Sequence, residues 1–221
     1  ADVAICARRA GPLDAAAERL SQTGRRILAV PADVTIDSDR QRIVETTEAR
    51  LGPIEVLVNN AGTTFRAAAE EMSLEQFDRQ MDLNVRAAFG LTQLVARGMI
   101  KRRRGRIIFI ASLMSEITRP GVSAYTASKG AIKQLTKSLA TEWARYGIRV
   151  NAIGPGYIAT PLTQPLRDDA GLNEWVLSRT PLGRWGRPED LVGAAVFLAS
   201  EASEFVTGQV IYVDGGFLIG S

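Results

Sequence analysis

The sequence predicts an α/β fold in which helices cover both faces of a doubly wound parallel sheet, within a single domain. Short apolar runs alternate with longer stretches whose apolar residues recur at helical spacing, a pattern typical of parallel sheets. Polar or glycine-rich residues directly follow several of the apolar runs, at the sheet edge where open α/β folds bind ligands. The chain has 221 residues, of which 46% are hydrophobic, so it is long enough for one sizeable core.

Each expected strand is a short apolar run that ends in a polar residue or a turn. The first run ends in Arg8, and the third ends in a polar turn at residues 59–62. The fourth ends in the hydroxyl of Ser112, and the fifth in the glycine-rich turn at residues 154–156. The expected strands cover residues 3–7, 27–30, 56–58, 106–111, 148–153 and 210–213.

Each expected helix begins or ends at a turn or a capping residue. Gly11-Pro12 is expected to break the chain before the first helix, and Gly52-Pro53 to stop the second. Ser73 and Gln76 have the spacing of a capping box, which opens a helical stretch that continues through Asn84. The expected helices cover residues 13–20, 37–50, 74–102, a segment from Tyr125 onward and 188–199.

Three side chains able to transfer or direct protons are expected to meet at one point. Tyr125 and Lys129 are four residues apart, so both leave the same face of a helix, and Ser112 ends the preceding strand. An ammonium about 4 Å from a phenol stabilises the phenolate by roughly 4 kcal/mol, enough to lower a tyrosine pKa from its usual value near 10. The spacing alone also describes an exposed helical pair, so the neighbouring motifs decide between the two interpretations.

Composition excludes several classes of chemistry. The sequence contains no histidine, so histidine-based nucleophiles and histidine metal sites are excluded, and no metal site is expected. General acid–base work then falls to tyrosine, lysine or carboxylates. The single cysteine, Cys6, cannot form an intramolecular disulfide, and cytoplasm is the expected location because no signal peptide or membrane-spanning run is found.

The net charge of +3 is modest, and the sequence contains one dense basic cluster. This cluster follows a long helical pattern, where cations complement the helix C-terminal dipole. A solvated helix end and a nucleic-acid or phosphate site are both compatible with it, and we favour the helix end and expect no nucleic-acid partner. The cluster comprises Lys101, Arg102, Arg103, Arg104 and Arg106.

Together these motifs resemble the short-chain dehydrogenase/reductase family, whose order and spacing they follow over essentially the whole chain. The motifs are Asn59-Asn60-Ala61-Gly62, Asn84, Ser112, Tyr125-Thr-Ala-Ser-Lys129 and Gly154-Pro155-Gly156. Within that family the chain looks most like the branch of gluconate 5-dehydrogenases and 2-dehydro-3-deoxy-gluconate 5-dehydrogenases. That narrower resemblance depends on residues 154–160, 179–186 and 203–209.

The resemblance implies a Rossmann-type fold and a role for each catalytic residue. Tyr125 would be the general acid for carbonyl reduction and the base for alcohol oxidation. Lys129 would lower the pKa of Tyr125 and hydrogen-bond the nicotinamide ribose, and Ser112 would orient the substrate oxygen. Asn84 would hold a water molecule in a proton relay to Lys129.

The resemblance also implies where a nicotinamide dinucleotide binds. Asp33 would accept a hydrogen bond from the adenine amine, beside Val34. Trp175, Arg184 and Trp185 fall in or near the family's substrate lid, although each of them taken alone has packing as its more common role. The remaining implied cofactor residues, besides Tyr125 and Lys129, are Asn60, Ala61, Gly62, Pro155, Gly156, Ile158 and Thr160.

The end of the first expected strand predicts the choice of dinucleotide. Enzymes that prefer NAD usually place a carboxylate there for the ribose 2′-hydroxyl, but this chain has Ala7 followed by Arg8 and Arg9. A guanidinium can engage a phosphate through two hydrogen bonds. We therefore expect NADP(H) to be preferred over NAD(H), with solvated loop arginines as the alternative interpretation.

The chain departs from the family pattern at its start. No three glycines have the Gly-x-x-x-Gly-x-Gly spacing that the family places after its first strand. The expectation is that the first strand, the glycine-rich turn and the first helix are absent from this sequence.

The expected function is hydride transfer between a nicotinamide cofactor and a secondary alcohol or ketone, on a small molecule such as gluconate or 5-ketogluconate. The alternatives are a 3-oxoacyl-carrier-protein reductase and a non-catalytic cofactor-binding protein of the same fold. The family commonly forms tetramers, so a homotetramer is expected through the helices at residues 87–99 and 131–144 and the last strand.

Overall fold

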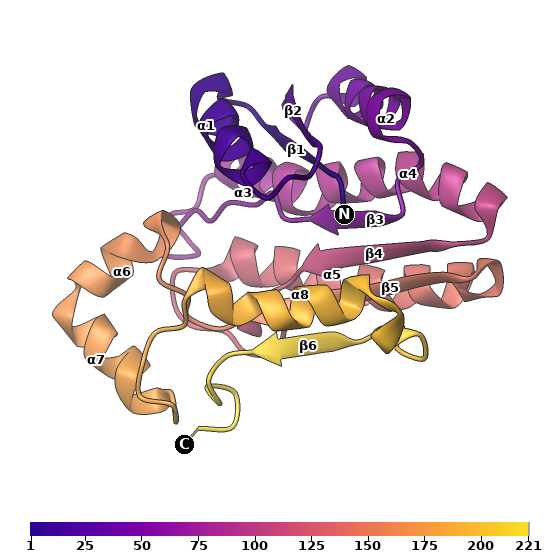
Figure 1. Cartoon of the computed structure of the whole chain (residues 1–221). Helices are drawn as coiled ribbons and strands as arrows, with labels where there is room; N and C mark the ends of the chain where they lie inside the picture. Colours follow the sequence, from indigo (N-terminus) through magenta and orange to yellow (C-terminus); the bar gives the residue numbers. More distant parts are fainter. Residues whose placement is uncertain (221) are drawn as a thin grey trace.

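A computed structural model describes residues 1–220, in which six strands form two parallel sheets (Figure 1). One sheet pairs β1 (Val3–Ala7) with β2 (Ile27–Pro31). The other has the order β3-β4-β5-β6, with all ladders parallel. Its strands are Val56–Asn59, Gly105–Ile110, Ile148–Pro155 and Val210–Val213.

The parallel register brings the carboxyl ends of these strands to one edge. Asn59 lies opposite Phe109, Ile110 opposite Ile153, and Pro155 opposite Val213. Residues that directly follow the strands therefore face a common region, as expected for ligand binding in an open α/β sheet.

The β1–β2 pair lies above the four-stranded sheet in Figure 1. Within residues 1–220 no backbone ladder joins the two sheets. The expectation that a central strand is absent stays a prediction.

The helices cover both faces of the sheets, and most lie where the sequence places them. Ser73 caps α3 by accepting a hydrogen bond from the Gln76 amide. No helix within residues 1–220 is long and apolar enough to cross a membrane. The helices are α1 (Ala10–Ser21), α2 (Asp37–Leu51), α3 (Leu74–Met81), α4 (Ala88–Arg102), α5 (Ser123–Trp143), α6 (Gln164–Asp168), α7 (Ala170–Arg179) and α8 (Val192–Ala199).

Three helix expectations were wrong in detail. Gly11-Pro12 does not break the chain but lies in the first turn of α1. Proline is tolerated there because the backbone N–H groups of the first turn have no acceptor within the helix. The long helix at 74–102 is interrupted by a π-helical segment, Asp82–Ala87. The last helix begins as a 3₁₀ turn, Pro188–Leu191, and α6 and α7 were not expected at all.

The main core lies between the sheets and helices α2, α4 and α5. Ile107 and Phe109 belong to it, while Ile108 packs on the other face with Leu198 of α8. This alternation follows from the period of two along a strand. Burial on both faces explains why the β4 sequence is continuously apolar after Arg106.

Four members of the basic cluster, Lys101 to Arg104, lie at the end of α4, as expected for a helix terminus, whereas Arg106 is buried in β4. Arg103 adopts the left-handed conformation at the cap, with φ of 53°, and its guanidinium donates to the carbonyl of Arg145. Arg102 donates to the carbonyl of Ile54. These cations satisfy backbone carbonyls and hold loops against the helix end.

We expect Gly147→Ala to lower the free energy of unfolding by roughly 1–3 kcal/mol. Gly147 has a φ of 69°, and an added Cβ would lie 2.6 Å from the carbonyl oxygen of Arg103. Gly11→Ala is the matched control, because a Cβ there meets nothing within 4 Å, and it should not destabilise. Urea denaturation measures both, and equal stabilities would contradict the close approach.

Candidate active site

The four expected catalytic side chains come from three elements around the end of β4. Ser112 follows β4 and caps a 3₁₀ turn (Leu113–Ser115), accepting a hydrogen bond from the Met114 amide at 3.1 Å. Tyr125 and Lys129 lie on α5, and Asn84 lies in the π-helical segment. The structure therefore brings all four together.

Lys129 is buried at the centre of this group, with 5% of its surface exposed. Its Nζ donates to the carbonyl oxygen of Ile110 at 2.7 Å, which ties α5 to the end of β4. Burial lowers the pKa of Lys129 to about 8, because a desolvated ammonium is disfavoured. The side chain is thus close to the midpoint of its titration at neutral to mildly basic pH.

Tyr125 does not have the lowered pKa that the sequence predicts. Burial raises its pKa, and the opposing influences are a hydrogen bond with Ser112 and the charge of Arg66. Lys129 Nζ lies 5.7 Å from the centre of the tyrosine ring and is directed to Ile110. The predicted lowering of the Tyr125 pKa by Lys129 was therefore wrong.

Asn84 holds the loop after β3 against α5. Its Nδ2 donates to the Thr63 carbonyl and to Ser128 Oγ, both at 3.0 Å, and its Oδ1 accepts from the Thr63 amide at 2.8 Å. π-Helical segments often occur at functional sites. Here the segment carries Asn84, whose side-chain amide uses both N–H donors and its oxygen in these hydrogen bonds. The water-holding role of Asn84 stays a prediction.

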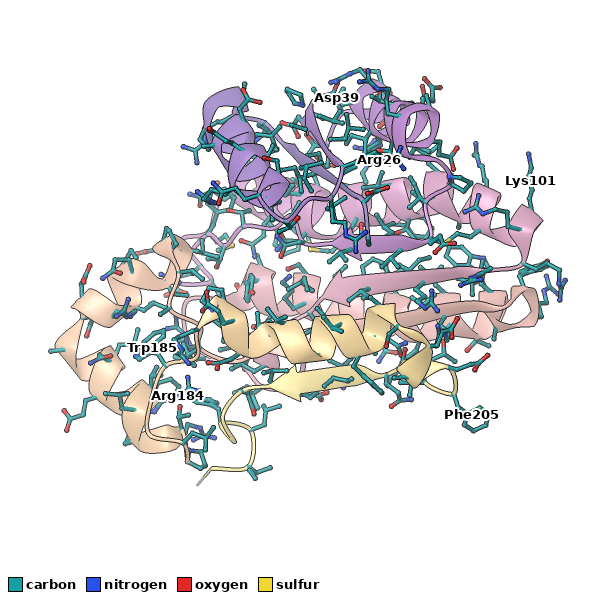
Figure 2. All side chains as sticks on the ribbon, in the orientation of Figure 1. Arg26, Asp39, Lys101, Arg184, Trp185 and Phe205 are labelled. Carbon is teal, nitrogen blue, oxygen red and sulfur yellow. The ribbon has the colours of Figure 1, made fainter. Side chains whose placement is uncertain are left out.

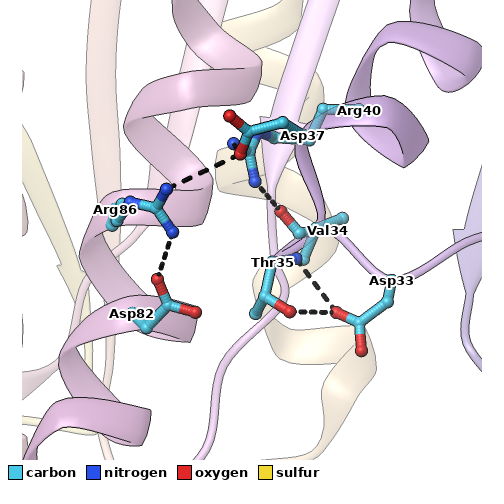
Figure 3. A network of polar contacts seen from close by, with 7 residues as sticks. All are labelled: Asp33, Val34, Thr35, Asp37, Arg40, Asp82 and Arg86. Atoms are coloured by element: carbon cyan, nitrogen blue, oxygen red, sulfur yellow. Dashed lines mark hydrogen bonds and ion pairs between the residues drawn. The ribbon is translucent and has the colours of Figure 1, made fainter.

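The loop after β2 contains Asp33 and Val34 and is fixed by a polar network (Figure 3). Asp33 Oδ1 accepts from the amide and the hydroxyl of Thr35, at 2.9 and 2.7 Å. Arg40, buried on α2, donates to the Val34 carbonyl at 2.6 Å and contacts Asp37. Asp37 also pairs with Arg86 of the π-helical segment, so the network links this loop to the element that carries Asn84.

Arg8 lies at the end of β1, as expected, and reaches toward this loop. Its guanidinium is 3.8 Å from Asp33 Oδ2, and its side chain is 72% exposed. Exposed pairs of this length contribute little, so Arg8 is available to another partner. Arg9 precedes α1, whose N-terminus has no side-chain cap and no acidic residue in its first turn.

The remaining expected cofactor residues divide into two groups. Asn60 and Ala61 are exposed beside Gly62, where an added Cβ would lie 3.4 Å from Asn84 Oδ1 and 3.8 Å from Lys129 Nζ. Pro155 ends β5, and an added Cβ at Gly156 would lie 2.6 Å from Asp214, so packing already requires this glycine.

Ile158 and Thr160 shape the loop after Gly156. Ile158 is buried and bridges to Gly186. Thr160 forms a reciprocal cap with Thr163, and this cap starts the turn before α6. The two residues are placed beside the site, and their contact with a cofactor stays a prediction.

A cavity of about 90 Å³ opens beside Ser112 and Tyr125. Its walls include Arg66, Arg119 and Tyr157, none of which the sequence reasoning named. Arg66 lies four residues after Gly62, and Arg119 lies between Ser112 and Tyr125 in the sequence. Their closeness to these motifs in the sequence is the signal that could have identified both arginines as cavity residues. Leu162, Thr163 and Leu166, at the start of the α6 region, form another wall.

The two expected lid tryptophans and Arg184 do not line this cavity (Arg184 and Trp185 are labelled in Figure 2). Arg184 forms an ion pair with Asp190 at 2.6 Å. Trp185 donates to Asn173 at 2.7 Å and packs edge-on against Tyr157. Trp175 also packs against Tyr157. Packing is therefore the role that the structure gives these three residues.

Comparison with known proteins agrees with the arrangement of the site. Residues 1–218 match the family described as enoyl-(acyl carrier protein) reductase. A gluconate 5-dehydrogenase from Gluconobacter oxydans (strain 621H) is 46% identical, over 99% of this chain and 86% of the relative. A 2-dehydro-3-deoxy-D-gluconate 5-dehydrogenase from Formosa agariphila is 43% identical, over 93% of this chain and 78% of the relative.

A solved structure gives the same result at the level of the fold. It is a gluconate 5-dehydrogenase from Burkholderia cenocepacia J2315 in complex with NADP and tartrate, with a TM-score of 0.96 and 41% identity. The match covers 100% of this chain and 87% of that chain. The chain therefore belongs to the short-chain dehydrogenase/reductase family.

Proposed function

We propose that this protein is an NADP(H)-dependent oxidoreductase that interconverts a secondary alcohol and a ketone on a sugar acid, such as gluconate and 5-ketogluconate. The observation that carries the proposal is the group of Ser112, Tyr125 and Lys129 beside a cavity with two arginines. Within residues 1–220 neither Arg66 nor Arg119 forms an ion pair with a carboxylate. A negatively charged substrate suits such a cavity.

The residues present fit a nicotinamide dinucleotide. A lysine ammonium has three donors, and Lys129 uses one of them on Ile110, which leaves two for ribose hydroxyls. Among residues 1–220 no hydrogen bond engages Asp33 Oδ2, which lies 3.8 Å from the exposed Arg8 guanidinium, so it can accept from an adenine amine. NADP(H), when bound, supplies or accepts the hydride.

The protein groups would manage the proton. In reduction, Tyr125 gives its hydroxyl proton to the carbonyl oxygen as the carbonyl carbon gains a hydride. In oxidation the same oxygen takes the proton of the alcohol. Ser112, which lies close enough to oppose the rise in the pKa of Tyr125, would hold the substrate oxygen at the phenol. Lys129 would hold the ribose and take part in the relay that exchanges the proton of Tyr125 with water.

The preference for NADP(H) follows from the end of β1. Arg8, Arg9 and the uncapped N-terminus of α1 together offer positive charge and free amides to a 2′-phosphate. The Burkholderia enzyme was crystallised with NADP. NAD(H) would bind the same site without this contact.

We expect Arg8→Ala to lower kcat/KM for NADP(H) by about 10-fold or more and to change that for NAD(H) less than about threefold, since only the 2′-phosphate contact is lost. Arg19→Ala, on the last turn of the same helix, is the charge-matched control and should change neither value. An equal loss for both cofactors would contradict the assignment of Arg8.

An acyl-carrier-protein reductase is the second candidate, because the matching family carries an enoyl-reductase description and the basic cluster could meet an acidic carrier. The small cavity with Arg66 and Arg119 favours the sugar acid over an acyl chain. Steady-state assays with gluconate and with a 3-oxoacyl thioester separate the candidates. Turnover of the thioester alone would replace the sugar-acid proposal.

We further propose a single-domain homotetramer that works in the cytoplasm. An open hollow of about 700 Å³ lies over α3, the π-helical segment, α4 and α5, with Val85, Phe89 and Leu135 among its lining residues. Phe205 projects fully exposed from the loop before β6 (Figure 2). The hollow includes Phe89 and Leu135, on the two helices expected to form subunit contacts, and Phe205 lies in the loop that leads to the expected strand. Light scattering tests the assembly.

A further inference from the structure

Tyr157 carries a buried hydroxyl that the proposed reaction does not use. Its ring is enclosed by aromatic neighbours, with centroid distances of 5.4 Å to Trp185 and 5.1 Å to Phe217. Within residues 1–220 its Oη has no hydrogen-bond partner. A buried polar group without a partner costs roughly 1–3 kcal/mol, and each such group calls for an explanation.

The surroundings of this hydroxyl are positively charged. Burial raises the pKa of Tyr157, while the charge and the adjacent side chain of Arg119, and the charges of Arg66 and Arg179, oppose the rise. Arg119 is thus beside the hydroxyl without the geometry of a hydrogen bond. The phenol therefore stays protonated at neutral pH and can donate a hydrogen bond to an acceptor in the cavity, and the surrounding guanidiniums favour an acceptor that is an anion. Tyr157 and Arg119 line the same cavity as Ser112 and Tyr125.

The two residues reach the cavity from different elements. Tyr157 follows the Pro155 end of β5, and Arg119 lies in the loop between the 3₁₀ turn and α5. The aromatic neighbours fix the Tyr157 ring, so its hydroxyl cannot turn away to find another partner.

We propose that Arg119 and Tyr157 together bind the carboxylate of the substrate, while Ser112 and Tyr125 hold the carbon–oxygen group that reacts. This inference rests on the proposed function and assigns the residues that select an acid over a neutral sugar. A carboxylate can accept from a guanidinium and a phenol at once, and such charge-assisted bonds are strong. A neutral polyol offers one hydroxyl in place of the carboxylate, so it loses the charge pairing with the guanidinium and one of the two acceptor oxygens, and the site should discriminate against it.

The test compares gluconate with glucitol, a polyol of the same length without the carboxylate. Tyr157→Phe and Arg119→Met should each raise KM for gluconate about 10-fold or more, with kcat within about threefold and glucitol kinetics unchanged. The double variant should lose less than the product of the single losses, because both residues bind one group. Arg167→Met, which removes an exposed charge from α6, is the control and should leave both substrates unaffected.

Binding of gluconate to the NADPH complex, measured by calorimetry, separates two kinds of failure. If the wild-type protein binds gluconate through Arg119 and Tyr157 but does not oxidise it, the proposed reaction is contradicted, whereas the proposed carboxylate-binding role of the two residues is supported. Unchanged gluconate affinity and KM in both variants would overturn the carboxylate-binding role of Arg119 and Tyr157, even if the enzyme oxidises gluconate. A Tyr157→Phe variant with a higher melting temperature and unchanged gluconate binding would also overturn the proposal, because the hydroxyl would then be a buried group without a partner and without a role in binding.

Discussion

Tyr125→Phe is expected to lower kcat by about 10²–10⁴-fold while NADP(H) binding is retained. The substitution removes only the hydroxyl, and a positioned proton donor contributes an acceleration of this size. Because burial raises the pKa of Tyr125, the wild-type residue is a proton donor at neutral pH. Carbonyl reduction should therefore be less sensitive to rising pH than alcohol oxidation, which needs the phenolate.

Steady-state kinetics in both directions, with fluorescence titration of NADPH, measure these effects. Tyr146→Phe is the matched control, because Tyr146 packs against the core in the 3₁₀ turn after α5. It should leave kcat unchanged. Turnover of Tyr125→Phe within a few-fold of wild type would remove the tyrosine from the mechanism.

Lys129→Met is expected to have the second-largest effect, lowering kcat/KM at least about 100-fold while stabilising the fold near neutral pH. The folded-state pKa of Lys129 is about 8, against an ordinary value of 10.5. Below pH 8 the lysine is charged in both states, and its burial costs about 3 kcal/mol. Methionine fills similar space without that cost, although the hydrogen bond to Ile110 is lost.

The pH dependence gives the sign of this effect. Between pH 8 and 10.5 the unfolded state binds more protons at Lys129 than the folded state does, so wild-type stability rises with pH across this window. The stability advantage of Lys129→Met should therefore be largest below pH 8 and shrink toward pH 10.5. Urea denaturation at several pH values measures it, and a difference that stays constant with pH would contradict the burial of an ammonium.

Much of the fold was predictable because local signals and tertiary contacts agree. The apolar pattern predicted both ends of β6 correctly, and Ser73 predicted where α3 begins. The π-helical segment Asp82–Ala87 was not predictable, because a short π-helical segment leaves the spacing of apolar residues along the helix nearly unchanged. The α6 and α7 helices were missed because their short sequences have no strong apolar periodicity.

The site was predictable where spacing fixes geometry. Four residues along a helix place Tyr125 and Lys129 on one face, and the end of β4 places Ser112 beside them. The direction of the Tyr125 pKa shift was wrong, because it depends on burial and on where Lys129 Nζ points. Arg66, Arg119 and Tyr157 come from three separate loops, and only folding brings them to one cavity.

Transfer of deuterium from C5 of labelled gluconate to the nicotinamide of NADP⁺, followed by mass spectrometry, tests the central claim most directly. The account predicts labelled NADPH and 5-ketogluconate in equal amounts from the wild-type protein, and at least about 100-fold less of both products in the same time from Tyr125→Phe. Bound NADP⁺ that stays unlabelled with gluconate would contradict the proposed hydride transfer and favour a protein that binds the cofactor without turnover.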